Sequence, residues 1–583
     1  MYASRYARTR FLRSVLAPLA LALPPLAWVA DATRRASLTP LGRDQGIFQY
    51  IAWALRQGQV DYRDVRDVNG PLTHWIHLAF LMVGGADEHR FRVLDLFVTG
   101  LTFAAVGACL PGLRSRRRPD ALERVAWAVA GWVVLSGQYL LYGFWDLAQR
   151  ESFFDWFLLP SVALQLVAQA PSRRALPPRR PILLAVVGAL SVVPWFGKPT
   201  YAAFTLVQLV AVVCDDTLPW PRRRALLAFG AGGAIGAASQ LGVLAALGAP
   251  LAFARIQLVD VPAMYRFIWP RAAMDIFSNA WCATQAIFAI TGAVVLVGLV
   301  ALREMPPRVL GVALLPICAL GSVAAQAKGF PYHFHPLTAS VHLQWLVFAA
   351  WLSERTRVGR RDRALLRLAP LAAATVFALR IATSMEDSPH IRATWLLWGA
   401  ATPEARSTRE YFAHFPEVDY FPYELRETAE YLRDHTQPQD RVQLYGMDPY
   451  LLFLARRLSA TPYIYAYDLN ADAALGGGTG GRPDGPQSER IRAIRDAHEA
   501  DLRARIAAQP PAAFVFLDGA PLLAQTDAWN DFADHCAGTA DWVRARYRET
   551  ARFGHDHVWL RKDLAAEPEA PAESPDDAPD QGP

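Results

Sequence analysis

The chain has 583 residues, of which 53% are hydrophobic and only 19% are charged, against roughly a quarter charged in soluble domains. This composition excludes a disordered, collagen-like or coiled-coil protein, and five cysteines exclude a disulfide scaffold. The net charge of +6 does not come from a basic patch interleaved with aromatic residues, so we exclude a nucleic-acid partner. The mean hydropathy of +0.13 is low for a protein embedded in a membrane throughout, which indicates two unlike parts.

Apolar segments of roughly 20 residues, the length that crosses a bilayer, recur as far as residue 383. They predict a polytopic α-helical membrane domain, residues 1–383, with about eleven transmembrane helices. The segments are 11–30, 90–111, 125–143, 152–170, 181–197, 200–213, 225–248, 282–302, 309–326, 337–352 and 364–383. The first segment has a second interpretation as a cleaved signal peptide, because a basic flank precedes it.

The distribution of basic residues predicts the orientation, because cytoplasmic loops retain arginine and lysine. Alternate connections on one side hold 24 of these residues, whereas the short loops on the other side hold six. This asymmetry places the N-terminus in the cytoplasm, and an odd number of spans places the C-terminal part outside. We therefore predict a multi-pass protein of a cytoplasmic (inner) membrane with a periplasmic or extracellular C-terminal domain.

The first predicted outer loop, residues 31–89, places a carboxylate, Asp44, just beyond the end of the first span. The segment Ile47–Gln57 then has one apolar and one polar face, which predicts a helix in the plane of the membrane surface. Spacing alone supports two roles for Asp44 equally, as the cap of this helix or as a catalytic carboxylate.

The second predicted outer loop carries Asp146, Arg150 and Glu151 within a few residues of one another. Charges at membrane depth, or just above it, are costly unless they are paired or functional. One interpretation is a local pair between Arg150 and a carboxylate that fixes the end of a helix. The other is a functional site at the outer face.

Lysine is rare in this chain, with Lys198, Lys328 and Lys562 against 56 arginines. The first two lie at outer ends of predicted spans, where arginine would anchor a helix equally well. A compact ammonium can approach a single phosphate oxygen, whereas the planar guanidinium of arginine presents a fork of donors that binds two oxygens. The placement therefore indicates a phosphate at that face, and the alternative is chance.

Two histidines, His333 and His335, lie on a short loop between Pro331 and Pro336. Their spacing matches no standard zinc pattern. We expect them to donate hydrogen bonds to an anion or a sugar, or to shape the loop, rather than to bind a metal.

From residue 384 the pattern becomes that of a soluble α/β domain, residues 384–563. Helical segments alternate with short apolar runs at Arg441–Tyr445, Tyr463–Tyr467, Ala513–Leu517 and His557–Leu560, which we interpret as buried strands. Residues 564–583 are acidic and rich in proline, which predicts a disordered tail.

Three of the outer loops resemble those of GT-C glycosyltransferases, the polytopic enzymes that include protein O-mannosyltransferases and lipid A aminoarabinose transferases. The resemblance covers residues 11–380 in layout and is sharp only in these loops. The matching runs are Gly42-Arg43-Asp44-Gln45-Gly46-Ile47-Phe48-Gln49-Tyr50-Ile51-Ala52, then Gly58 and Tyr62–Pro71, and later Gln149-Arg150-Glu151 and Lys328-Gly329-Phe330-Pro331-Tyr332-His333.

The resemblance implies that Asp44 is the catalytic base and that a carboxylate of the second outer loop binds the acceptor or a metal. Asp146 and Glu151 are the candidates for that second role. The chain departs from the family where relatives usually show Trp-Asp-His-Lys-Pro-Pro, because Arg66–Pro71 reads Arg-Asp-Val-Asn-Gly-Pro. Any role of that lysine is therefore absent or moved.

We therefore expect an inverting transferase that moves a sugar from a polyprenyl-phosphate donor to a hydroxyl of a glycan, lipid or protein at the outer face. A nearby cation would stabilise the departing phosphate. The candidate phosphate- or substrate-binding residues are Lys198, Lys328, His333, His335, Arg150 and Tyr332. No cofactor is required by this chemistry, although a divalent metal remains compatible with it.

Two other functions fit a polytopic chain. A lipid-linked-sugar flippase or other transporter would show internal repeats and facing charges near the middle of the membrane. An O-antigen polymerase or ligase would place an arginine and histidine pair in one large late loop. We find no repeat, and here the long loop comes first and carries an aspartate, so the glycosyltransferase is favoured.

Overall fold

The computed structural model describes residues 16–113, 119–170, 179–218, 220–355, 363–386, 402–415 and 417–565. Contacts group the chain into two compact units, which we call the helical unit (Met1–Tyr423 and Ala471–Arg492) and the α/β unit (Glu424–Asn470 and Ala493–Pro583). The predicted domain boundary at residue 383 stays a prediction. Nearly all of the predicted acidic tail, from residue 566 onwards, lies outside the described residues.

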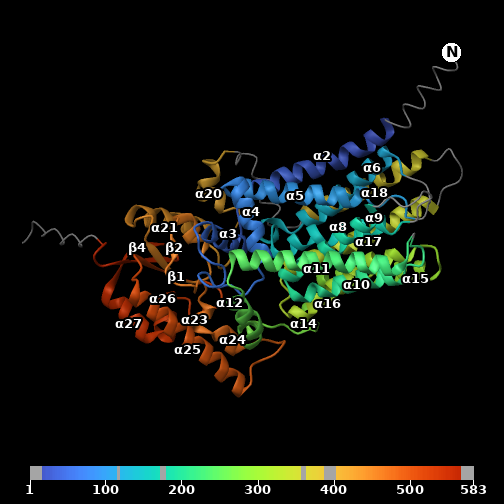
Figure 1. Ribbon diagram of the computed structural model, residues 1–583. Helices are drawn as coiled ribbons and strands as arrows, with labels where there is room; N and C mark the ends of the chain where they lie inside the picture. Colours follow the sequence, from blue (N-terminus) through green and yellow to red (C-terminus); the bar gives the residue numbers. More distant parts are fainter. Residues whose placement is uncertain are drawn as a thin grey trace, which may run out of the picture. The chain divides into compact units, whose positions relative to one another are not determined.

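A helix lies over each of the eleven apolar segments that we predicted as membrane spans (Figure 1). These helices are α2 (Ala17–Ser37), α5 (Glu88–Ala108), α6 (Ala121–Leu140), α8 (Arg150–Ala168), α9 (Arg179–Val192), α10 (Ala202–Cys214), α11 (Arg222–Leu247), α15 (Ala280–Ala301), α16 (Leu310–Gln326), α17 (His335–Arg355) and α18 (Arg363–Glu386). A 3₁₀ turn, η2 (Val193–Phe196), replaces the end of the predicted span 181–197, where Pro194 cannot continue the α-helical hydrogen bonding.

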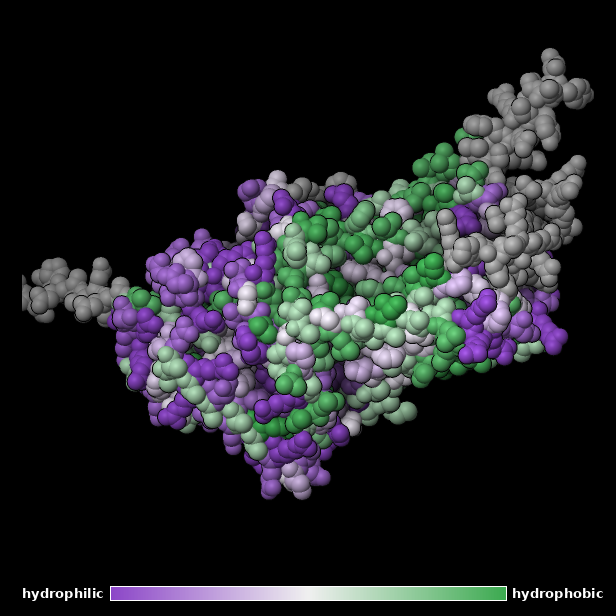
Figure 2. Space-filling view, in the orientation of Figure 1, coloured by the Kyte–Doolittle hydropathy of each residue, from purple (hydrophilic) through white to green (hydrophobic). Residues whose placement is uncertain are grey.

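Four segments of the described chain are helical, long and apolar enough to cross a membrane: Glu88–Ala108, Arg222–Leu247, Ala280–Ala301 and Pro307–Gln326. Hydrophobic residues also cover the surface of α2 and α5 (Figure 2), including the exposed Leu19, Leu23, Phe97 and Leu101. Such a surface would be unfavourable in water but matches the interior of a bilayer. The protein is therefore an integral membrane protein, while the number of spans stays a prediction.

Glycines allow pairs of these helices to pack closely. A Cβ on Gly107 of α5 would collide with the backbone of Trp127 on α6, and one on Gly232 of α11 would collide with the backbone of Ala185 on α9. Small residues at the contact are the usual means by which membrane helices approach each other.

Two helices occupy the first predicted outer loop, α3 (Arg43–Arg56) and α4 (Leu72–Gly84). The predicted surface helix exists as α3, but it is buried inside the helical unit along almost its whole length, so the expectation of a water-exposed polar face is wrong. The polar side chain of Gln49, which would face water on a surface helix, is 1% exposed and is hydrogen-bonded to His77 of α4, at 3.1 Å. The helix α4 was not predicted.

The α/β unit contains a five-stranded sheet with the order β2-β1-β3-β5-β4. Its strands are β1 (Arg441–Tyr445), β2 (Leu458–Ser459), β3 (Ala513–Leu517), β4 (Tyr547–Phe553) and β5 (Asp556–Arg561). The first three run parallel, and β5 and β4 are antiparallel additions at one edge. Phe514 and Phe516 of β3 pack against apolar residues of α25 (Gly485–Ala508), α26 (Ala528–His535) and α27 (Ala537–Arg546).

Three of the four predicted strands are confirmed, and the predicted strand Tyr463–Tyr467 is wrong. The segment is as buried as a strand, which explains the misleading pattern, but it does not pair with the sheet. The Gln443 side chain donates to the Tyr463 carbonyl at 3.0 Å, and the Ala466 amide donates to the Gly446 carbonyl at 2.8 Å. These bonds satisfy the buried backbone without a strand.

Candidate functional site

Asp44 lies in the first turn of α3 and does not cap it. The cap is Gly42, whose backbone amide donates to the Gln45 side chain at 2.7 Å. Within the described part of the chain, no side chain donates a hydrogen bond to the Asp44 carboxylate, and the residue is partly exposed. Desolvation raises the pKa of Asp44, while the positive charges of Arg150 and Arg43 oppose that rise. The capping interpretation is therefore wrong, and the carboxylate is accessible.

A buried hydrogen-bond network joins the start of α3 to the second outer loop. The amide nitrogen of the Gln45 side chain donates to the carbonyls of Phe144, at 3.2 Å, Trp145, at 3.1 Å, and Leu147. Arg92 of α5, which is 0% exposed, donates to the Gln45 side chain at 2.9 Å and to the Phe144 carbonyl at 3.2 Å. Asp44 is thus fixed relative to the loop that carries Asp146 and Arg150.

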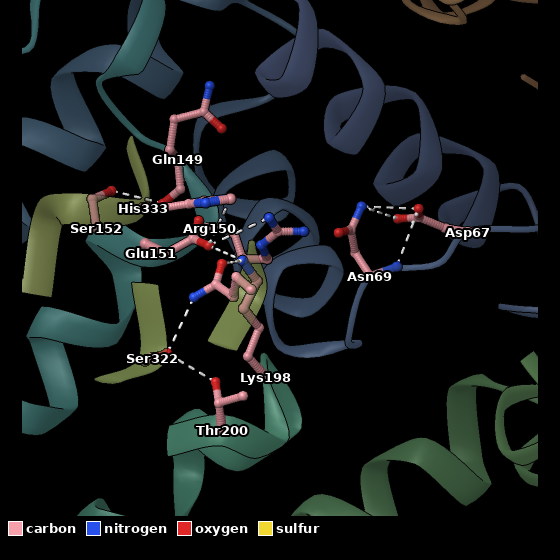
Figure 3. Close-up of polar contacts among 11 residues, drawn as sticks. Asp67, Asn69, Gln149, Arg150, Glu151, Ser152, Lys198, Thr200, Ser322 and His333 are labelled. Carbon is pink, nitrogen blue, oxygen red and sulfur yellow. Dashed lines mark hydrogen bonds and ion pairs between the residues drawn. The ribbon is translucent and has the colours of Figure 1, made fainter. Parts of the chain in front are cut away.

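Glu151 is the centre of the charged cluster at this face (Figure 3). It is 0% exposed, and one carboxylate oxygen lies 3.3 Å from Arg150, 3.7 Å from His333 and in direct contact with the Lys198 ammonium. Lys198 also donates to the Gln326 side chain. The start of α8, the loop before α10, the end of α16 and the turn η7 (Pro331–Phe334) therefore meet here. The predicted local pair of Arg150 with a carboxylate is present, with Glu151, and it is part of a larger cluster.

The charges of this cluster shift one another's protonation. Burial opposes ionisation of Glu151, but Arg150 and Lys198 outweigh it and lower the pKa of that carboxyl. Burial and the nearby Arg150 charge lower the pKa of Lys198 to about 7, and burial lowers the pKa of His333. The site thus holds Arg150 and a titratable lysine against one carboxylate, with a neutral imidazole beside them. Such an excess of positive charge suits an anionic group.

The remaining candidate residues for binding the phosphate or the substrate are Tyr332, His335 and Lys328, and each has its own contacts. The Arg150 guanidinium lies over the Tyr332 ring, with its central carbon 5.9 Å from the ring centroid. His335 is hydrogen-bonded through Nε2 to the backbone carbonyl of Asp146, at 2.8 Å, and stacks on Tyr142 with ring centroids 3.7 Å apart. Lys328 donates to the carbonyls of Tyr265, at 3.2 Å, and Ile268. The structure thus groups Arg150, Lys198, His333 and Tyr332, and it gives His335 and Lys328 structural contacts.

Asp146 is close enough to Asp44 for the charges of the two carboxylates to interact. Its backbone carbonyl is hydrogen-bonded to His335. The side chain is 8% exposed, and its Oδ1 has no hydrogen-bond partner among the described residues. Desolvation, and then the charge of Asp44, raise the pKa of Asp146 well above its ordinary value. Among the described residues, no group of three metal-ligating side chains converges here.

The sequence reasoning missed a second buried cluster in the first outer loop. His74 of α4 bridges Asp61, at 2.9 Å, and Asp67, at 2.8 Å, and all three side chains are 0% exposed. Asp67 also accepts from Asn69 at 2.9 Å and acts electrostatically on Asp44. A histidine inside the apolar run Leu72–Gly84 was the available signal, because such a residue needs buried partners.

The fold of the chain is similar to that of solved structures of ArnT. The solved structures that it is similar to include ArnT from Cupriavidus metallidurans in the apo state, with a TM-score of 0.54 and 14% sequence identity over 93% of this chain and 99% of that one. The same protein bound to undecaprenyl phosphate gives a TM-score of 0.50 at 13% identity, over 95% and 99% of the two chains. No family model and no curated protein matches the sequence. The fold predicted from the loop resemblance is thereby confirmed.

Proposed function

We propose that the protein is a membrane glycosyltransferase that transfers a sugar from a polyprenyl-phosphate donor to an acceptor hydroxyl at the outer face of the cytoplasmic membrane. One observation carries the proposal. An accessible carboxylate without a hydrogen-bond donor, Asp44, lies within electrostatic range of two cations, the buried Arg150 and the partly buried Lys198. A base next to an anion-binding site is what transfer of a sugar from a phosphate requires.

Asp44 accepts the proton of the acceptor hydroxyl while the hydroxyl oxygen forms a bond to the anomeric carbon. Its raised pKa makes it a stronger base than an exposed aspartate, provided that it is ionised. The bond between the anomeric carbon and the phosphate oxygen breaks, and its electron pair leaves with the polyprenyl phosphate. A single displacement assisted by one base inverts the configuration at the anomeric carbon.

The departing phosphate gains negative charge as the bond breaks, so cations beside it stabilise the transition state more than the ground state. Arg150 and Lys198 supply these charges, and Glu151 holds both in place through its ion pairs. Tyr332 and His333 border the same cluster and are the candidates to contact the sugar or its phosphate. Asp146 is the candidate to bind the acceptor, which is a glycan, a lipid or a protein.

The likeness to a fold that has been solved with undecaprenyl phosphate supports a lipid-linked donor. The predicted orientation, with these loops outside, supports transfer at the outer face, where a flipped lipid-linked sugar presents its head group. The apolar outer surface of the helical unit leaves the lipid tail in contact with the bilayer.

Comparison of Asp44→Asn with the unaltered chain tests the proposal. Surface glycans and polyprenyl-phosphate sugars are analysed by mass spectrometry in a deletion strain that carries either form. We expect Asp44→Asn to remove one sugar from the glycans and to accumulate its lipid carrier. Asp64→Asn, a charge-matched control in the same outer loop where Asp64 pairs with Arg63 at 2.7 Å, should leave both profiles normal. Unchanged profiles in Asp44→Asn would refute the assignment.

A further inference from the structure

A segment beyond the last membrane helix lies against the loop that carries Asp44. We call it the strap and define it as residues 409–415 and 417–420. The Tyr411 hydroxyl donates to the carbonyl of Leu38 at 2.7 Å, and the Tyr420 hydroxyl donates to the carbonyl of Leu41 at 3.2 Å. The strap is thus hydrogen-bonded along the short connection between α2 and α3, immediately before Asp44.

Apolar contacts extend the same docking to the second outer loop. A buried cluster joins the two loops and the strap, and its members are Leu38, Phe144, Tyr411, Phe412 and Phe415. The rings of Phe144 and Phe415 meet at 4.9 Å between centroids, and those of Trp145 and Tyr420 at 5.3 Å. The strap therefore touches both loops of the site at once.

Arg43 is the basic residue at the contact between the strap and these loops. Its guanidinium lies 3.0 Å from the carboxylate of Asp419 and donates to the Asp419 backbone carbonyl. It lies 5.4 Å from the centroid of the Tyr420 ring, and its side chain is only 7% exposed. Glu417, also in the strap, lies within electrostatic range of Arg43.

Arg43 directly precedes Asp44, so its position matters for the proposed base. A guanidinium that paired with the Asp44 carboxylate would occupy the lone pairs that must accept the proton and would make the carboxylate less basic. In the structure the Arg43 side chain is instead engaged by the strap, and Asp44 accepts no hydrogen bond from any described side chain.

We propose that the strap is a positioning element for the transfer reaction: its carboxylates, with Asp419 in contact, hold Arg43 away from Asp44 and keep that carboxylate available as the base. The inference rests on the proposed function. It assigns a role to residues between the last membrane helix and the α/β unit that the reaction scheme does not otherwise use. Asp419 and Arg43 act through Asp44 and do not themselves touch the reacting atoms.

The test compares an uncharged strap, Glu417→Gln with Asp419→Asn, with the same strap that also carries Arg43→Gln. Transfer is measured in membrane vesicles with polyprenyl-phosphate sugars extracted from host membranes as the donor. We expect the uncharged strap to lower kcat about tenfold, because Arg43 would then form a partly buried ion pair with Asp44. The KM of the donor should change little. Adding Arg43→Gln should restore kcat, because no cation remains to pair with Asp44.

Asp541→Asn is the charge control, because it removes an exposed carboxylate of the α/β unit, paired with Arg544 at 3.1 Å, and should leave kcat unaltered. The proposal is overturned if the uncharged strap is fully active, if Arg43→Gln fails to restore kcat in well-folded protein, or if Asp541→Asn causes the same loss. The melting temperature in detergent monitors folding of each variant. Retained transfer in Asp44→Asn would instead refute the proposed function itself, so the two failures are distinguishable.

Discussion

The Lys198 ammonium pairs with the carboxylate of Glu151, which lies at the start of α8, 47 positions earlier in the chain. The same carboxylate oxygen lies 3.3 Å from Arg150, so one buried negative charge is shared by two cations. The sharing holds both cations within electrostatic range of Asp44, and Glu151 by itself neutralises only one of them. The proposed phosphate site thus depends on a carboxylate that need not touch the phosphate.

Replacing the Glu151 carboxylate by an amide should destabilise the fold, in addition to its effect on transfer. Glu151→Gln leaves Arg150 and Lys198 buried together without their counter-charge, and removing one partner of a buried ion pair costs about 3–5 kcal/mol. We expect a lower melting temperature in detergent and less protein in the membrane. Adding Lys198→Met should restore part of the stability by removing one of the two cations. A double variant no more stable than Glu151→Gln would contradict this electrostatic cause.

The pH dependence of donor use should depend on Lys198. Its pKa is lowered to about 7, so the ammonium is present below that pH and is lost as the pH rises through it. Because kcat/KM reports the ionisation of the free enzyme, we expect kcat/KM for the donor to fall above pH 7. Lys198→Arg, which stays charged, should lack this alkaline decline. The same decline in Lys198→Arg would assign it to another group.

The acidic side of the same profile should report Asp44. Burial raises the pKa of this carboxyl, so the base is protonated, and kcat/KM falls, at a higher pH than for an exposed aspartate. Neutralising Arg43 removes a charge that opposes the rise. Arg43→Gln should therefore move the acidic limb to higher pH, and a shift to lower pH would contradict the assignment.

The sequence alone predicted much of this arrangement, for identifiable reasons. Long apolar segments have few alternatives in a membrane, so all eleven coincide with helices. Arg150 and Glu151 were candidates because charges near a bilayer are costly, and Asp44 because it lies just beyond the end of the first predicted span. Lys198 and Lys328 looked equivalent in the sequence, but only Lys198 meets Glu151, whereas Lys328 donates to backbone carbonyls. Which partner a buried lysine finds depends on distant segments, and local patterns do not contain that information.

The two neighbouring histidines differ in the same way and give a contrast that experiments can resolve. His335 stacks on Tyr142 and is hydrogen-bonded to a backbone carbonyl, whereas His333 borders Glu151. We expect His335→Phe, which keeps a ring but loses the hydrogen bond, to lower the melting temperature with little effect on the KM of the donor. His333→Ala should raise that KM severalfold while changing stability less. Equal effects of the two variants on KM would contradict the placement.

The cluster of His74 with Asp61 and Asp67 should stabilise the first outer loop more strongly than any other histidine contact in it. Both ring nitrogens face a buried carboxylate oxygen, at 2.9 and 2.8 Å, so both carry protons and the ring is cationic. His74→Phe preserves the ring volume but leaves two buried carboxylates without this donor, which should lower the free energy of unfolding by about 3–5 kcal/mol.

His77, one turn along α4, is the matched control. It is also 0% exposed, but its single described side-chain hydrogen bond is to the neutral Gln49, at 3.1 Å. His77→Phe should cost only about 1 kcal/mol, the typical net value of a neutral hydrogen bond. Thermal unfolding of both variants in the same detergent measures the difference. Equal losses would show that ring packing, rather than the paired carboxylates, accounts for the stability, and adding Asp61→Asn to His74→Phe should recover stability only if the uncompensated charge is the cause.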